Sequence, residues 1–429
     1  MHKTYYDQIQ ETMYSKTLDN GLQVFLLPKQ QMAKTFSVFT TEYGSIDQSF
    51  TPIGQDNFVT VPEGIAHFLE HKLFEKEDRD VFQDFTKQGA SANAFTSFNS
   101  TAYLFSGTSN IKENVKTLLD FVQDPYFSNQ SVEKEKGIIA QEIRMYDDQP
   151  DWRAFFGTIQ SLYHHHPVQV DIAGTVDSIQ PITKEDLYTC YHTFYHPSNM
   201  SFFMAGNFDA EEMMGFIEAN QQAKTFPAPE PIRRHYPNEP HSVAEPHKLI
   251  KMPVSTAKCM IGIKEDMNHI KGRNALQLEM IKSMVLDHFF SKSGAFYEEL
   301  YQAGLVDDSF SYESHLDKTF GFTIIGGNTR DPQKFQQRVK KMLHELKERS
   351  ISDEEFERMK KKRIGQFLRS MNSLEYIATT FVQYHHLGVD LFQALPTIES
   401  LTKEEVLNHL QAWIHEDRIA VCEIQPEEG

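Results

Sequence analysis

The sequence predicts an α+β protein with two domains. Strand-like and helical patterns alternate along the whole chain, which indicates the α+β class. The chain has 429 residues, which is more than one ordinary hydrophobic core accommodates. Prolines are dense over residues 226–246, and since proline fixes φ and lacks an amide donor, this segment is expected to be an extended linker. The predicted domains are therefore residues 1–225 and 247–429.

Before the linker, local patterns define several elements. The predictions from strand-like and helical periodicity are strands over residues 22–27 and 35–41 and a helix over residues 110–122. Thr183-x-x-Asp186 resembles a capping box and opens a further helix. That helix is expected to end by His196, because Pro197 disfavours its continuation.

After the linker, the pattern again mixes the two kinds of element. The predictions are a strand over residues 257–264, a buried helix over residues 276–290 and an amphipathic helix over residues 331–349. Ser352-x-x-Glu355 is a second capping box, which opens a long helix toward Arg369.

The segment His67-Phe68-Leu69-Glu70-His71 reads H-x-x-E-H. On a helix, residues four apart share a face, so His67 and His71 can direct both imidazoles at one metal ion. Glu70 projects from nearly the same face and can reach a water on that metal without binding the metal. This combination suits metal-assisted hydrolysis. The alternative is a hydrogen-bonded histidine pair in the core, but the apolar neighbours make unpaired polar groups costly.

A third metal ligand is predicted at Glu142, on a helix that covers residues 135–145. Glu135 and Glu142 are two helical turns apart and share a face. Glu142 would bind the metal, and Glu135 would orient a histidine ligand or the substrate. The alternative is a solvated acidic face, which is common on helices. The tract His164–His166 is not expected to bind metal, because adjacent residues cannot all face one ion.

Composition excludes some classes of partner. The formal net charge is -18, which argues against nucleic-acid binding. No run of about 18 apolar residues is present, so no membrane span is expected. Cys190, Cys259 and Cys422 have neither metal nor disulfide spacing, and the N-terminal residues lack the apolar core of a secretory signal. These features favour the reducing cytoplasm.

Several motifs together resemble one known family. The matching segments are Asn20–Val24, Gly64–Ala66 before the histidine motif, Gly89–Tyr103, Glu135–Glu142 with Asp148–Pro150 after it, His166–Pro167, Gly174–Thr175, Tyr195–Met200 and Gly206–Asn207. On these segments, which cover most of the chain, the sequence is similar to the pitrilysin, insulin-degrading enzyme and mitochondrial processing peptidase family of zinc metallopeptidases.

The resemblance implies a fold and a set of roles. It implies two domains of similar topology, each a mainly antiparallel sheet packed with helices, which together form one half of a clamshell. It also implies that His67, His71 and Glu142 ligate zinc. Glu70 would be the general base and Glu135 would support the site. The substrate would be a peptide or a precursor protein.

The same resemblance identifies a strand for substrate binding. Asn93, Ala94, Phe95 and Thr96 resemble the family's edge strand, which holds extended peptides by strand addition. The alternative is an ordinary half-buried strand.

One departure from the family affects the expected assembly. Members with a complete site carry an arginine and a tyrosine, seven residues apart, in the opposite half of the clamshell. Here Tyr301 and Asp307 stand near those positions, and no arginine lies between Asn274 and Thr329. We expect a homologous partner subunit to supply the pair in a heterodimer, whereas a homodimer would lack it. The alternatives are a non-catalytic scaffold subunit and a peptide-binding module.

Overall fold

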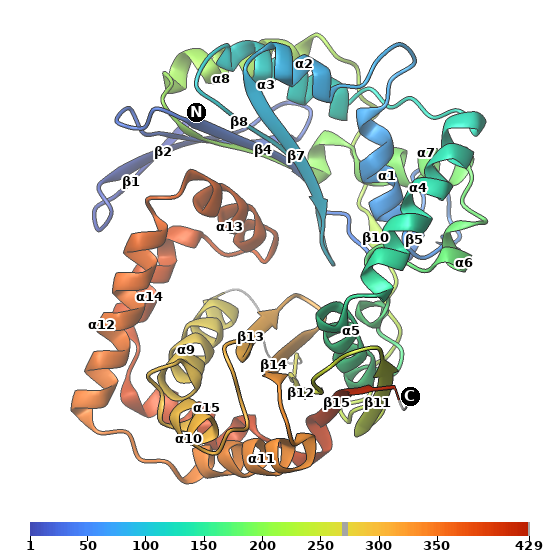
Figure 1. The fold of residues 1–429 in the computed structure, drawn as a ribbon. Coiled ribbons are helices and arrows are strands. Elements are labelled where there is room, and N and C mark those ends of the chain that lie inside the picture. The colour runs from blue at the N-terminus through green and yellow to red at the C-terminus, as the bar shows by residue number, and fades with distance from the viewer. Residues whose placement is uncertain (268–272, 428–429) are drawn as a thin grey trace. The chain divides into compact units, whose positions relative to one another are not determined.

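The computed structural model describes residues 1–267 and 273–427 and has the predicted α+β fold (Figure 1). The chain forms two compact units. Unit 1 comprises Met1–Arg144, Val170–Tyr236 and Arg369–His386, and unit 2 comprises Met145–Gln169, Pro237–Leu368 and Leu387–Gly429. Among the described residues, no helix combines the length and apolar character needed to cross a bilayer.

The compact units exchange two stretches of sequence. Residues 145–169 pack in unit 2 although they precede the predicted linker, and residues 369–386 pack in unit 1 although they follow it. Each stretch carries a helix that packs on a sheet, namely α5 (Pro150–Leu162) in unit 2 and α13 (Leu374–His386) in unit 1. The linear domain limits stay a prediction, and the compact units differ from them in these two stretches.

Unit 1 contains a seven-stranded and a three-stranded sheet. The larger sheet has the order β1-β2-β3-β9-β4-β8-β7, with β3 and β9 parallel and all other neighbours antiparallel. Its strands are β1 (His2–Tyr6), β2 (Glu11–Thr17), β3 (Gln23–Pro28), β4 (Thr35–Thr41), β7 (Ala90–Thr96), β8 (Thr101–Gly107) and β9 (Met200–Gly206). The smaller sheet joins β5 (Ser49–Thr51), β6 (Val59–Thr60) and β10 (Arg233–Arg234). Because β7 ends the larger sheet, it is an edge strand.

Helices cover both faces of the seven-stranded sheet. The helices of unit 1, not all of which contact this sheet, are α1 (Ile65–Phe74), α2 (Phe82–Lys87), α3 (Ile111–Val122), α4 (Asn129–Asp147), α6 (Val176–Ile179), α7 (Lys184–Phe194), α8 (Ala210–Gln222), α13 and the 3₁₀ turn η2 (Pro197–Asn199). Figure 1 shows α2, α3 and α8 over one face and α13 over the other. Alternation along β3 explains this, because Val24 and Leu26 join the main core whereas Phe25 contacts Phe381 of α13, with ring centroids 4.8 Å apart.

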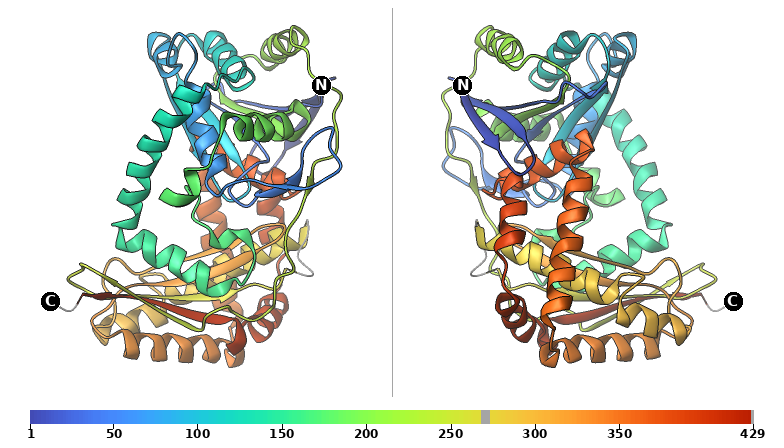
Figure 2. Two further views of the ribbon diagram at one scale, coloured as in Figure 1. Left: turned by 90° about the vertical axis from the view of Figure 1, so that its right-hand side faces the viewer. Right: turned by 90° about the vertical axis from the view of Figure 1, so that its left-hand side faces the viewer.

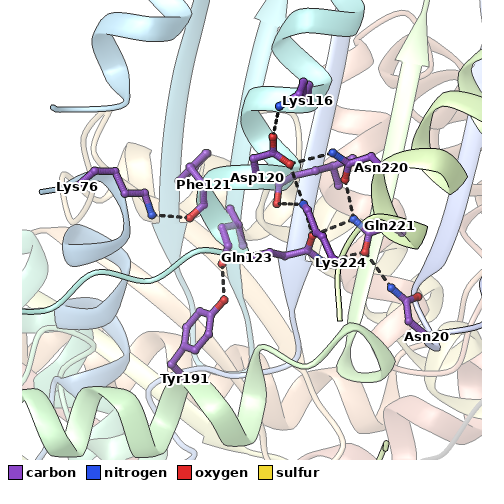
Figure 3. Close-up of polar contacts among 12 residues, drawn as sticks. Asn20, Lys76, Lys116, Asp120, Phe121, Gln123, Tyr191, Asn220, Gln221 and Lys224 are labelled. Atoms are coloured by element: carbon purple, nitrogen blue, oxygen red, sulfur yellow. Dashed lines mark hydrogen bonds and ion pairs between the residues drawn. The ribbon is translucent and has the colours of Figure 1, made fainter. Parts of the chain in front are cut away.

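The C-terminal carbonyls of α3 are bound by side chains from three other segments (Figure 3). The pairs are Lys224 Nζ with Leu119 O at 3.2 Å, Lys76 Nζ with Phe121 O at 2.8 Å, and Tyr191 Oη with Val122 O at 3.0 Å. The last carbonyls of a helix have no partner within it, and cations there interact favourably with its dipole. Lys76 follows the end of α1 by two residues, so this contact fixes α1 against α3.

Unit 2 contains a five-stranded sheet that repeats the topology of unit 1. Its order is β11-β15-β12-β14-β13, with β11 and β15 parallel and the rest antiparallel. The strands are β11 (His247–Met252), β12 (Lys258–Lys264), β13 (Ser311–Leu316), β14 (Gly321–Asn328) and β15 (Ile419–Pro426). In unit 1, β3-β9-β4-β8-β7 has the same sequence of connections and the same parallel pair. The prediction of two domains of similar topology is confirmed.

Helices also cover both faces of the sheet in unit 2. The helices of unit 2, not all of which contact the sheet, are α5, α9 (Arg273–Phe290), α10 (Ala295–Gln302), α11 (Pro332–Glu348), α12 (Asp353–Ser370), α14 (Ala394–Ser400), α15 (Lys403–Trp413) and the 3₁₀ turns η1 (Pro167–Gln169), η3 (Leu391–Gln393) and η4 (Glu416–Arg418). Figure 2 shows α5 (teal) and α11 (orange) on opposite sides of the sheet. A Cβ on Gly262 of β12 would lie 2.5 Å from Thr158 Cγ2, so glycine permits the close approach of α5.

The elements predicted from local patterns are confirmed within a few residues. They correspond to β3, β4, β12, α3, α7, α9, α11 and α12. The capping box is present at α7, where Thr183 Oγ1 accepts from the Asp186 amide at 3.1 Å and Asp186 Oδ2 accepts from the Thr183 amide at 2.9 Å. Residues 226–246 contain one short strand, β10, and no helix, as the proline density predicts.

Unit 2 buries an ion pair beside a neutral histidine. Lys282, which is fully buried, pairs with Glu265, and Glu265 also accepts from Trp413 Nε1 at 3.1 Å and from Thr323 Oγ1 at 3.1 Å. His409 stacks on Trp413, with ring centroids 5.4 Å apart. Burial lowers the pKa of His409 to about 3, and the charge of Lys282 acts in the same direction.

We expect His409 to make the stability of the protein depend on pH. The unfolded histidine takes up a proton near pH 6.5 whereas the folded one does so near pH 3, so the free energy of unfolding falls as pH drops below 6.5. Between pH 7 and pH 5 the free energy of unfolding should therefore fall by about 1–2 kcal/mol less in His409→Leu than in the wild type. Urea unfolding at both pH values measures this difference. The exposed His2→Gln is the control, and an unchanged pH dependence in His409→Leu would contradict the prediction.

Candidate metal centre

Helix α1 carries the histidine motif through the core of unit 1. Every residue of α1 except His71 is buried. The helix follows Gly64, which has φ of 86° and whose Cβ, if present, would lie 2.3 Å from Ala173 O. Glycine is therefore required at this position, both for its backbone conformation and for the close contact. This contact fixes the start of α1.

The structure brings His67, His71 and Glu142 together. One ligand atom from each lies within 4.8 Å of the others. His67 Nε2 is 3.7 Å from Glu142 Oε1, and His71 Nε2 is 3.5 Å from Glu142 Oε2. The two histidines come from successive turns of α1, and the glutamate comes from α4.

These distances fit a shared divalent cation. Ligand atoms about 2.0–2.2 Å from a tetrahedral zinc ion are about 3.4 Å apart. The two measured pairs are close to that value and longer than the usual 2.7–3.2 Å of an N–H···O hydrogen bond. Two imidazoles and one carboxylate also form a donor set found in catalytic zinc sites. The residues present therefore fit the metal that the motif predicts.

The two histidines differ in their electrostatic surroundings. Burial and, to a smaller extent, the charge of the neighbouring His71 together lower the pKa of His67 to about 3. Burial acts in the same direction on His71, but its hydrogen bond to Glu135 and the charges of Glu70 and Glu142 outweigh this and raise its pKa. His67 is therefore neutral over the whole physiological range, whereas a metal ion bound here would compete with a proton at His71.

Glu135 lies behind His71, in a position from which it can orient the imidazole ring. Its Oε1 is 3.1 Å from His71 Nδ1, which leaves Nε2 of that ring directed toward Glu142. Glu135 is buried, and its second oxygen lies 3.9 Å from Lys72 Nζ. Lys72 is fully buried and also pairs with Glu75. The lysine thus offsets the negative charge beside the histidine.

Glu70 lies next to the three metal-ligand candidates and is held by Thr96. The Thr96 hydroxyl donates to Glu70 Oε2 at 2.6 Å. Burial raises the pKa of Glu70, and the charge of Glu142 adds to this, whereas the Thr96 hydrogen bond and His71 oppose it. A carboxylate with a raised pKa beside a metal centre is suited to accept and return a proton.

The four residues predicted to contact substrate all lie on the edge strand β7. Asn93 Oδ1 accepts from the amide of Ala94 at 2.9 Å, and the side chain of Phe95 is 39% exposed. Thr96 instead points at Glu70. The position of β7 at an edge agrees with the expected geometry, and substrate binding by these residues stays a prediction.

Two contacts of this site were not predicted from the sequence. Lys72 could have been noticed as a lysine inside an apolar helix, directly after a candidate ligand. No sequence signal links Thr96 to Glu70, because they are 26 residues apart and meet only through the packing of α1 against β7.

The positions expected for an arginine and a tyrosine lie in unit 2. Tyr301, on α10, is 60% exposed and stacks on Tyr297, with ring centroids 5.9 Å apart. Asp307 accepts from the amide of Ser309 at 2.8 Å. Neither residue carries a positive charge, as the sequence predicted.

The structure has two units of like topology, and one of them carries a His-His-Glu cluster. These are the features expected of the metallopeptidase family that the sequence resembles. Comparison with family models agrees with this. Residues 60–176 match "Insulinase (Peptidase family M16)", and residues 181–363 match "Peptidase M16 inactive domain". The chain belongs to peptidase family M16, so the resemblance to the pitrilysin group is confirmed.

Some similar proteins match almost the whole length of the chain. The "uncharacterized zinc protease YmfH" of Bacillus subtilis is 50% identical over 98% of both chains. A solved structure of a protein of Alicyclobacillus acidocaldarius, described as M16-like, has a TM-score of 0.93 at 41% identity and covers 97% of this chain and 99% of that one. The periplasmic protease PqqL of Escherichia coli shares the fold, with a TM-score of 0.73 at 17% identity over 99% of this chain and 48% of that one.

We expect the cluster to bind one zinc ion per chain. Removing a ligand (His67→Ala, His71→Ala or Glu142→Ala) should abolish stoichiometric zinc binding, because two remaining ligands do not complete the site. Removing only the support (Glu135→Gln) should weaken zinc affinity about 10–100-fold. Zinc content after dialysis and competition with a chelator measure both effects. Glu133→Gln, on an exposed side chain of the same helix, is the control; full zinc content in Glu142→Ala would refute the ligand set.

Proposed function

We propose that this chain is a zinc metalloendopeptidase subunit that cleaves peptides held in an extended conformation. The observation that carries the proposal is the convergence of His67, His71 and Glu142 within 4.8 Å, with the buried carboxylate of Glu70 beside them. The names of the relatives support it, since they are described as zinc proteases. Zinc is the proposed cofactor, held by these two histidines and Glu142.

The proposed reaction assigns a separate role to each residue of the site. Bound zinc would supply Lewis-acid activation of the scissile carbonyl and of water. Glu70 takes the proton from the attacking water and returns it to the leaving amine. Glu135 holds the ring of His71 through Nδ1, so that Nε2 remains available as a ligand.

The proposed substrate is a peptide or precursor protein that adds a strand to β7. An edge strand has free backbone groups on one side, so it can pair with an extended peptide with little demand on side-chain sequence. Asn93, Ala94, Phe95 and Thr96 belong to the part of β7 that leads to Glu70. A peptide aligned there would pass the proposed metal centre.

A homologous partner subunit is the proposed source of the missing arginine and tyrosine. Uncharged Tyr301 and acidic Asp307 cannot supply a cation to the negative charge that develops on the attacked carbonyl. The similarity to PqqL supports this, because the chain corresponds in length to about half of a protein with the same fold. The proposed assembly is a heterodimer in which each chain forms one half of a clamshell; a homodimer would have metal without the cationic clamp.

A second candidate is a non-catalytic subunit that binds peptides or serves as a scaffold. The match of residues 181–363 to a domain described as inactive favours it. We rank it behind the peptidase because both histidines, the third ligand and the base are all in place. For compartment, we propose the cytoplasm, which agrees with three buried free cysteines.

We expect Glu70→Gln to separate catalysis from metal binding. Loss of the general base should lower kcat about 10²–10⁴-fold while zinc content stays at one ion per chain. Hydrolysis of an internally quenched peptide library, assayed with and without chelator, measures the rate. Glu77→Gln, an exposed glutamate just after α1, is the control. A Glu70→Gln protein with wild-type kcat would contradict the assigned base.

We expect activity to depend on the partner. The isolated chain should hydrolyse the peptide library slowly, and addition of a co-purified homologous subunit that carries the arginine should raise kcat about 10²–10³-fold. Size-exclusion chromatography with light scattering identifies which assembly is active. Full activity of the isolated chain as a monomer would refute the split site.

A further inference from the structure

The hydroxyl of Thr96 is in direct contact with the proposed general base. It donates to Glu70 Oε2 at 2.6 Å, at the low end of O–H···O distances and in the range of bonds to an ionised acceptor. We propose that Thr96 is a positioning residue: it holds Oε2 of Glu70 and so leaves Oε1 to exchange the proton. This inference rests on the proposed peptidase function and reassigns Thr96 from substrate contact to support of the base.

The direction of the hydrogen bond follows from the carboxylate, which when ionised can only accept, and the neighbouring hydroxyl of Thr101 is the weaker competing acceptor. Thr101 is fully buried, and its Oγ1 donates to the carbonyl of Tyr43 at 2.9 Å. Its single proton is thereby used, so it can offer only lone pairs to Thr96, which lies 3.5 Å away. The proton of Thr96 is directed to Glu70, which is the nearer and more strongly accepting partner.

The backbone around Thr96 is a rigid support. Thr96 and Thr101 are paired across β7 and β8, and Ser97 and Ser100 close the connection, with the Ser97 amide donating to Ser100 O at 2.8 Å. The amide of Ser45 donates to Ser97 O at 3.1 Å, which ties the turn to the segment after β4. A support fixed on both sides can hold a side chain to the accuracy that a catalytic group requires.

The two oxygens of Glu70 thus become inequivalent. A free carboxylate rotates about its last torsion and offers either oxygen, whereas one donor bond of fixed direction selects a single orientation. Because Thr96 ends the strand that we propose aligns the peptide, the same segment would position both substrate and base. A displacement of about 1 Å at such a group costs about 10²-fold in rate, so the constraint is large enough to measure.

Thr96→Val tests the role because it keeps the shape of the side chain and removes the hydroxyl. With the zinc-loaded chain and its partner, hydrolysis of the quenched peptide library should show a kcat about 10–100-fold lower with KM and zinc content unchanged. Thr96→Ser should restore kcat close to the wild-type value. Thr86→Val, at an exposed threonine on α2, is the matched control. A raised KM with unchanged kcat would instead return Thr96 to substrate contact and overturn the proposal.

A double-variant cycle shows whether Thr96 acts through Glu70. Combining Thr96→Val with Glu70→Gln should reduce kcat no further than Glu70→Gln alone, because the group that is positioned has already been removed. Multiplicative losses in the double variant would mean that Thr96 acts on something other than the base, and would overturn the proposal.

Crystal structures give a readout that does not need activity. In zinc-loaded wild type, Glu70 should keep one carboxylate orientation, with Oε2 on Thr96. In Thr96→Val, it should occupy more than one orientation, and a single unchanged orientation would overturn the proposal. If the wild type with its partner hydrolyses no peptide, the proposed function fails, and these two structures alone decide the role of Thr96.

Discussion

Burial of charged and polar side chains on α1 is the constraint on which this site depends. Between His67 and Lys72, the helix carries four polar side chains into the hydrophobic core of unit 1. Left unpaired, each would cost several kcal/mol. Partners are provided by the packing of α4, which brings Glu135 and Glu142, and of β7, which brings Thr96. The elements around α1 are therefore held in one arrangement by the need to satisfy these groups.

The same arrangement is fixed by contacts that involve no candidate ligand. Gly64 sets the start of α1 against the backbone of Ala173, and Lys76, just after its end, binds a carbonyl of α3. The separation between the histidines and Glu142 thus follows from packing, before any cation is considered. A site held in this way is preorganised, so that metal binding needs little rearrangement of the protein.

The two units share a topology but differ in chemistry. Unit 2 repeats the five-strand order of unit 1, and among the described residues the group suited to hold a metal lies in unit 1. Unit 2 instead buries the pair of Lys282 and Glu265 beside His409. The proposed function therefore rests on the side chains placed on one copy of the topology, as is general for folds that recur with different activities.

The sequence by itself determined the α+β class, the main elements and the H-x-x-E-H helix, because these depend on periodicity and spacing within short segments. It also singled out Glu142, which the structure brings to the histidines. Only the tertiary structure decided the exchange of α5 and α13 between units and the contact of Thr96 with Glu70. Those features join residues far apart in the chain through packing, and local patterns carry no information about which distant surfaces meet.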